Sequence, residues 1–223
     1  ISDHGYHLGH QQKWGKTTNF ENSTRAPLIV SSPNHRKGKR STQLVEYVDL
    51  YATLCDLTDI EIPKYTEGTS IKPLLENPDR EWKTAAFSQF PRGRKMEGYS
   101  MRTADYRYTE WRLSNGKIDA TELYDHKNDA IESINIAYKK ENESLVNELS
   151  QKLNAGWKAA LPKGIENNSN NPIAPPHVKW SKTKNKFIKK KIMTFENTDV
   201  LDLWTRVEGY QLSVKDQLLH IDV

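Results

Sequence analysis

S-D-H-G-Y-H-L-G, residues 2–9, is the stretch that decides the fold class of this 223-residue chain. Gly5 lets the backbone turn sharply, so the side chains of Asp3 and His4 can converge on one point. A carboxylate beside an imidazole suits a metal ion or a phosphate-like ester. Alone the pair is weak evidence, because most Asp-His-Gly sequences in loops are solvated turns. The interpretation therefore depends on the residues that follow.

Three further motifs lie within the next twenty residues: K-W-G-K at 13–16, N-F-E at 19–21 and R-A-P-L-I at 25–29. In this order they resemble the second signature region of type I, formylglycine-dependent sulfatases. Later segments resemble the iduronate-2-sulfatase branch of that family; these are residues 45–54, 88–92, 98–103, 106–111 and 122–125. The resemblance covers about residues 1–163 and ends there.

The resemblance implies an α/β protein, namely the C-terminal part of the sulfatase and alkaline-phosphatase-like fold. Residues 1–62 would then be the end of the large α/β domain. Residues 63–163 would be a small α+β subdomain of antiparallel strands with a C-terminal helix. We expect residues 164–194 to be a Lys-rich linker and residues 195–223 to begin a truncated β-rich module or extension.

Hydrophobic patterning predicts the elements of these regions. Apolar spacings of three and four predict amphipathic helices over residues 42–57 and 141–160. The apolar run at 26–30 predicts a buried strand. Further strands are predicted at residues 84–90, 99–103, 106–113 and 122–125, and in the tail after residue 195.

The resemblance also assigns roles to the acidic and basic residues near the start of the chain. Asp3 and His4 would bind Ca²⁺, with His4 also near the sulfate, because calcium prefers oxygen ligands. Lys16 matches the lysine that contacts the sulfate ester oxygens. A fixed cation at that point stabilises the negative charge that spreads over a transferring sulfuryl group.

Other side chains are candidates for contact with the sugar. Tyr6 and Trp14 would shape the sugar pocket, and Arg92 lies in a segment that can reach a substrate carboxylate or form a surface salt bridge. His7 and His10 are expected to be polar loop residues.

The sequence contains no C-x-P-S-R or S-x-P-S-R motif, whose Cys or Ser becomes the formylglycine nucleophile of the family. Cys55, the single cysteine, does not match it and is expected to be buried packing. By the resemblance, the nucleophile, the remaining calcium ligands and the general acid precede Ile1. We therefore expect this chain to be inactive by itself.

The function implied is hydrolysis of sulfuric esters in an exported protein, acting on a sulfated, uronic-acid-containing polysaccharide or oligosaccharide. Two alternatives stay open: an inactive carbohydrate-binding or anchoring remnant, and a related hydrolase of the phosphatase superfamily. The sequence leaves the oligomeric state open.

Nucleic acid is not an expected partner, although the net charge is +4. Seven lysines lie between Lys179 and Lys191, so the rest of the chain is nearly balanced in charge. Phe187 interrupts these lysines as an aromatic residue, and Trp180 stands beside the first of them. Proteins that bind single-stranded nucleic acids need more aromatic side chains on which bases can stack. No apolar run reaches the ~18 residues of a membrane-spanning helix.

Overall fold

The structure is a computed structural model, and it describes residues 1–35, 38–93, 95–167, 169, 211–215 and 218–222. It divides into two units, Ile1–Pro172 and Ile173–Val223, each described by itself. In the second unit, β7 (Gln211–Lys215) and β8 (Leu218–Asp222) form an antiparallel hairpin. The prediction of strands in the tail is confirmed there. The predictions for residues 170–210 lie outside the described residues.

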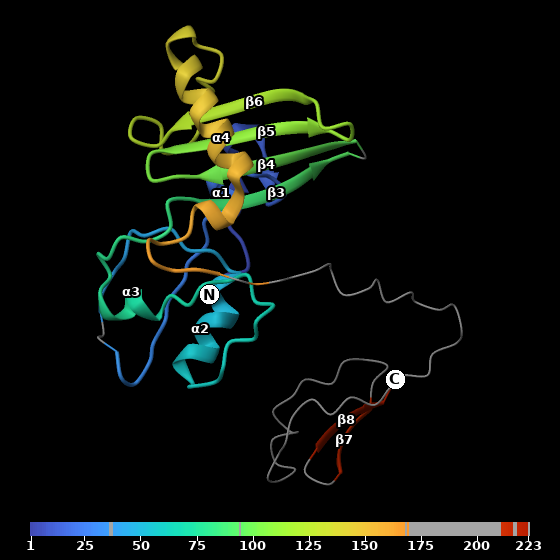
Figure 1. Cartoon of the computed structure of the whole chain (residues 1–223). Helices are drawn as coiled ribbons and strands as arrows, with labels where there is room; N and C mark the ends of the chain where they lie inside the picture. The colour runs from blue at the N-terminus through green and yellow to red at the C-terminus, as the bar shows by residue number, and fades with distance from the viewer. Residues whose placement is uncertain (36–37, 94, 168, 170–210, 216–217, 223) are drawn as a thin grey trace. The chain divides into compact units, whose positions relative to one another are not determined.

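A four-stranded antiparallel sheet forms the centre of the first unit (Figure 1). Its strands follow one another in sequence order: β3 (Ala86–Arg92), β4 (Met96–Arg102), β5 (Tyr106–Leu113) and β6 (Ile118–Asp125). Short connections between antiparallel neighbours give this order directly. The four strands predicted between residues 84 and 125 are confirmed, with ends shifted by a few residues.

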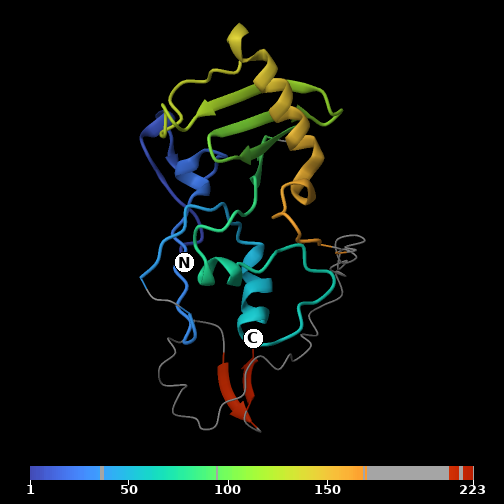
Figure 2. The ribbon, with the colours of Figure 1, turned by 60° about the vertical axis from the view of Figure 1, so that its left-hand side comes forward.

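The helix α4 (Glu143–Ala159) lies across one face of this sheet (Figures 1 and 2). Leu149 and Leu153 lie one turn apart and are buried, because side chains four residues apart share a helix face. They pack into a core with residues of β4, β5 and β6, namely Met101, Tyr108 and Leu123. The predicted second helix is confirmed.

The N-terminal segment covers the opposite face with β1 (His7–Leu8), β2 (Trp14–Gly15) and α1 (Glu21–Thr24). Asn19 donates a hydrogen bond of 2.9 Å from its side-chain amide to the carbonyl of Gly98 in β4. A Cβ at Gly98 would lie 2.6 Å from the ring of Trp111, so this close approach requires glycine. The sheet is therefore enclosed by two different layers.

A buried ion pair connects α2 (Asp49–Leu57) to the start of the sheet. The Lys83 ammonium lies 2.7 and 2.9 Å from the two carboxylate oxygens of Asp49 and 2.8 Å from Glu46. Glu46 also accepts a hydrogen bond from the backbone N–H of Phe87 in β3. Because the side chains of Asp49 and Lys83 are 1% and 4% exposed, the two charges depend on each other.

The helix predicted at residues 42–57 is confirmed with its end at Leu57, but its start is wrong: it begins at Asp49, because Leu44 pairs with Lys83 in an isolated antiparallel bridge. A second prediction in this region is wrong. The strand expected at 26–30 is absent from the described residues, and Ile29 is 83% exposed. An extended segment forms a ladder only beside another strand, and the described residues offer none. The short helix α3 (Lys72–Glu76) was not predicted.

Leu123→Ala should lower the free energy of unfolding by about 2–5 kcal/mol, because it leaves a cavity beneath α4. Leu123 has no exposed surface, whereas Ile118 in the same strand is 44% exposed. Ile118→Ala is therefore the matched control, with an expected change within about 0.5 kcal/mol. Chemical denaturation followed by circular dichroism measures both, and equal losses in the two variants would contradict this core.

Candidate active site

The loop that carries Asp3 and His4 is fixed by backbone contacts on both sides. Ser2 donates its N–H to the carbonyl of Pro27 at 3.2 Å, and Gly5 donates to Ser23 at 2.9 Å. A Cβ at Gly5 would lie 2.0 Å from the carbonyl oxygen of Asn22. Only glycine permits this approach, which brings the turn against α1 and its flanking residues.

Asp3, His4 and Lys16 form one cluster. The Lys16 Nζ lies 2.7 Å from His4 Nε2, and an Asp3 carboxylate oxygen lies 3.0 Å from the same nitrogen. His4 Nδ1 lies 2.7 Å from the carbonyl of Gly5, which can only accept, so Nδ1 carries the proton. An unprotonated Nε2 accepts from the Lys16 ammonium, whereas a protonated Nε2 donates to the Asp3 carboxylate. The structure thus brings together the three residues predicted for calcium and sulfate binding.

The cluster is open to solvent and its donor set is small. The side chain of Asp3 is 80% exposed and that of His4 31% exposed. Ca²⁺ takes six to eight oxygen ligands, and Asp3 supplies carboxylate oxygens suited to such a shell. His4 offers a nitrogen that already faces Lys16. The chemistry therefore fits Asp3 as a metal ligand better than His4.

Tyr6 and Trp14 lie close to this cluster in the sequence. Tyr6 precedes β1 and Trp14 lies in β2, and the two strands pair as the antiparallel hairpin that leads to Lys16. The side chains of Tyr6 and Trp14 are 57% and 76% exposed, so neither ring is used in the core. Arg92 is placed differently. Its guanidinium lies 4.6 Å above the ring of Trp111, and it forms no salt bridge within the part of the chain that the structure describes.

His7 was expected to be a polar loop residue, and this expectation is wrong. Its side chain is fully buried, with Nε2 2.8 Å from the Thr18 hydroxyl, which in turn lies 2.8 Å from that of Ser23. The His7 ring also meets Phe20 edge-on, with centroids 5.9 Å apart. His7 therefore holds the hairpin against the segment that follows Lys16.

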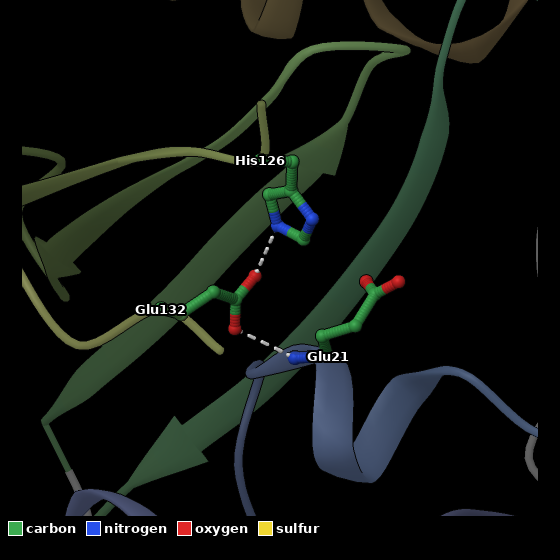
Figure 3. A group of neighbouring side chains, drawn as sticks. All are labelled: Glu21, His126 and Glu132. Atoms are coloured by element: carbon green, nitrogen blue, oxygen red, sulfur yellow. Dashed lines mark hydrogen bonds and ion pairs between the residues drawn. The ribbon is translucent and has the colours of Figure 1, made fainter. Parts of the chain in front are cut away.

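A buried ion network beneath the hairpin was not found by sequence reasoning. Arg107 of β5 reaches the carboxylates of Glu21 and Glu132, each at 2.5 Å. Glu132 also accepts the backbone N–H of Glu21 at 2.7 Å, and His126 Nε2 lies 2.8 Å from it (Figure 3). Since Glu21 and Glu132 are 111 residues apart, no local pattern connects them.

Glu21, His126 and Glu132 have the composition of a small metal site, with possible ligand atoms within 4.8 Å of one another (Figure 3). However, the Arg107 guanidinium bonds to both carboxylates and supplies the opposing charge. Arg102 adds a second cation 3.4 Å from Glu21; burial lowers the pKa of Arg102, yet a guanidinium stays charged at neutral pH. The group is an ion-pair network that supports the site.

The antiparallel sheet with its C-terminal helix and the clustered Asp3, His4 and Lys16 side chains are the features expected of the C-terminal part of the sulfatase and alkaline-phosphatase-like fold. Residues 9–159 match the family model described as N-sulphoglucosamine sulphohydrolase, C-terminal. The chain therefore belongs to the sulfatase family. The family model that it matches describes the C-terminal region of such proteins.

Individual relatives agree with this assignment. The chain is 32% identical over 160 residues to an N-acetylglucosamine-6-O-sulfatase of Bacteroides thetaiotaomicron, covering 68% of this chain and 28% of that protein. It is 27% identical over 216 residues to the iduronate 2-sulfatase of Mus musculus, covering 66% and 39%. The chain thus spans less than two fifths of the length of these relatives.

A solved structure is also similar, with a TM-score of 0.62 and 31% identity over 69% of this chain and 32% of that chain. That protein was solved in complex with its substrate, D-glucosamine-2-N,6-O-disulfate. The predicted fold class and family are thereby confirmed.

The pKa of Glu132 predicts how the network responds to acid. Burial raises this pKa, but the hydrogen bond from His126 and the charge of Arg107 outweigh burial and hold it below the ordinary 4.5. The unfolded chain therefore binds a proton at a higher pH than the folded chain does. The resulting stabilisation is complete above pH 4.5 and is lost as the pH falls through the folded pKa.

Glu132→Gln should be less stable than the unaltered chain at neutral pH, and its stability should fall less steeply between about pH 5 and 3. Urea unfolding at a series of pH values measures this difference. Glu148→Gln is the matched control, because Glu148 is 58% exposed on α4 and should leave the profile unchanged. Parallel profiles for the unaltered chain and Glu132→Gln would contradict the assigned role of Glu132.

Proposed function

We propose that this chain supplies the C-terminal part of an exported sulfuric ester hydrolase that removes sulfate from a sulfated polysaccharide or oligosaccharide. The observation that carries the proposal is the exposed Asp3, His4 and Lys16 cluster, supported by a buried scaffold in a chain of the sulfatase family. Within the described residues no helix is long and apolar enough to cross a membrane.

Lys16 would act on the charge of the sulfuryl group. An ammonium at the end of an exposed side chain can approach ester oxygens, and it stabilises the charge that develops as the sulfur–oxygen bond breaks. His4 orients it, because the Nδ1 bond to the Gly5 carbonyl keeps Nε2 available as an acceptor. Asp3 would supply carboxylate oxygens to a Ca²⁺ shell.

The rest of the catalytic equipment would come from the part of a sulfatase that the relatives have beyond the aligned region. That part would hold the formylglycine, which would supply the nucleophilic oxygen, and the remaining Ca²⁺ ligands. Neither a C-x-P-S-R nor an S-x-P-S-R motif occurs in the 223 residues. The contribution of this chain is therefore to bind and neutralise the sulfate and to shape the sugar pocket.

The substrate we propose is a glycan that contains sulfated amino sugar or uronic acid. The named relatives act on N-acetylglucosamine 6-sulfate and iduronate 2-sulfate groups, and the similar solved protein binds a sulfated glucosamine. Tyr6 and Trp14 would offer aromatic faces to the sugar rings. Arg92, which is exposed above Trp111, would reach the carboxylate of a uronic acid.

In the complete enzyme, Lys16→Ala should lower the turnover of a sulfate ester by about two to three orders of magnitude, because a fixed cation is lost from the transition state. Turnover of 4-nitrocatechol sulfate or a sulfated glucosamine measures this loss. Lys13→Ala, which removes another exposed lysine of the same loop, should leave turnover nearly unchanged. Near-normal turnover in Lys16→Ala would refute the role of Lys16.

The isolated chain should bind Ca²⁺ no more tightly than about millimolar, because Asp3 and His4 cannot replace a shell of six or more oxygens. Isothermal titration calorimetry measures the affinity, and Asp3→Asn should remove what binding there is. Micromolar binding that survives Asp3→Asn would show that calcium is held elsewhere in the chain.

A further inference from the structure

A groove of about 370 Å³ lies where the C-terminal end of α4 meets β3 and β4. Three aromatic rings line it, together with two amides and a guanidinium: Phe87, Tyr99, Trp157, Gln89, Asn154 and Arg112. Successive side chains of a strand point to opposite faces, so Tyr99 shares the α4 face with Met101. The groove and the Asp3, His4 and Lys16 cluster are therefore built on different layers of the unit.

The groove owes its shape to a break in α4. Gly156 has φ 74° and ψ −176°, outside the helical region, so the last residues of the helix leave its axis. Apart from its chain neighbours and the nearby helix backbone, no heavy atom lies within 4 Å of the position that a Cβ at Gly156 would occupy, so the positive φ is what favours glycine here. Trp157 follows at once, and its ring remains partly exposed at the side of the groove. Glycine at this position thus permits the backbone break that precedes the indole.

Arg112 is fixed rigidly inside the groove. Its guanidinium lies 5.0 Å over the ring of Tyr99 and donates to the fully buried carboxylate of Glu110 at 2.5 and 2.8 Å. A further bond of 2.9 Å joins it to the side-chain oxygen of Asn154. Its Nη1 makes no hydrogen bond within the described part of the chain. Donor groups are therefore available in a fixed position, while Glu110 cancels the charge.

This combination has the chemistry that a sugar ring requires. The apolar C–H face of a pyranose packs on an aromatic ring, and its hydroxyls bond to planar amides and guanidinium groups. The volume is within the range of small-ligand sites. Glu110 pairs the charge of Arg112, and the Lys158 ammonium lies 5.4 Å from the centre of the Trp157 ring, so the groove can take a pyranose with or without a sulfate group. We propose that the groove binds a pyranose ring of a polysaccharide, at a site separate from the candidate active site.

The choice of a carbohydrate as the ligand rests on the proposed function. The residues of the groove, however, are not among those to which the proposed function assigns a role. A glycan bound in this groove would be held by one sugar ring while the enzyme acts on another. Such a second contact raises the effective concentration of sulfated sugar near Lys16 without changing the chemical step.

The test is titration of the 223-residue chain with two probes, neutral chitotetraose and a heparin tetrasaccharide, followed by calorimetry. Trp157→Ala should weaken the binding of the sugar that occupies the groove by about tenfold, and Arg112→Gln by a similar factor. Lys13→Ala and Ile118→Ala are controls at exposed positions outside both the groove and the candidate active site, and they should leave that binding unchanged. Binding of chitotetraose identifies a plain pyranose as sufficient, whereas binding of heparin alone identifies a sulfated one.

Two results would overturn the proposal: no binding of either probe, or binding that Trp14→Ala or Lys16→Ala weakens and Trp157→Ala does not. Circular dichroism checks the fold of every variant. If Trp157→Ala fails to fold, Gln89→Ala decides the question, because Gln89 is exposed and its side chain contacts only Glu97 by hydrogen bonding among the described residues. Loss of turnover in Lys16→Ala of the complete enzyme tests the proposed function separately.

Discussion

The position of the candidate active site depends on the Arg107 guanidinium, which lies between the carboxylates of Glu21 and Glu132. One carboxylate belongs to α1, directly after the segment that carries Lys16, and the other to the loop after β6. Removing one partner of a buried ion pair leaves an uncompensated charge and typically costs about 3–5 kcal/mol. The interaction therefore selects one placement of the N-terminal segment on the sheet and penalises others.

A second buried pair, Asp49 with Lys83, does the same for α2. It joins the N-terminus of that helix to the residues just before β3, and Asp49 also accepts the backbone N–H of Thr69 at 2.9 Å. From α2 the connection continues to the site itself, because Tyr47 donates its hydroxyl to the carbonyl of Ser2. The loop with Asp3 and His4 is thus connected to the sheet along two polar routes.

The sequence predicted the elements whose partners are near in the chain. β4 and β5 are joined by a short turn, and the leucines of α4 repeat every fourth residue, so both patterns are local. The resemblance to sulfatases indicated Asp3, His4 and Lys16, which lie within hydrogen-bonding distance of one another, while their catalytic roles stay predictions.

Long-range features were beyond such reasoning. The partners of Arg107 come from segments 86 and 25 residues away, and no periodicity connects them. His7 was misjudged because a histidine among glycines and polar residues reads as a loop, whereas Thr18 and Phe20 enclose it. The strand at 26–30 failed for the converse reason: an apolar run reports a tendency to be buried and does not supply neighbouring strands.

The two faces of the sheet are joined to their layers by different forces. Against α4 an apolar core surrounds Leu123 and Leu149, and such contacts stabilise without strong directionality, although the buried Glu110 also accepts a hydrogen bond from Ser150 of α4. Against the N-terminal segment the contacts are charged and hydrogen-bonded, through Arg107 and Asn19, and such contacts act only in one geometry. Loss of a charge in the Arg107 network should therefore loosen the placement of the segment that carries Lys16 and also lower the free energy of unfolding, because Arg107 and Glu132 are buried. Loss of an apolar contact such as Leu123 should lower the free energy of unfolding without removing a directional contact to that segment.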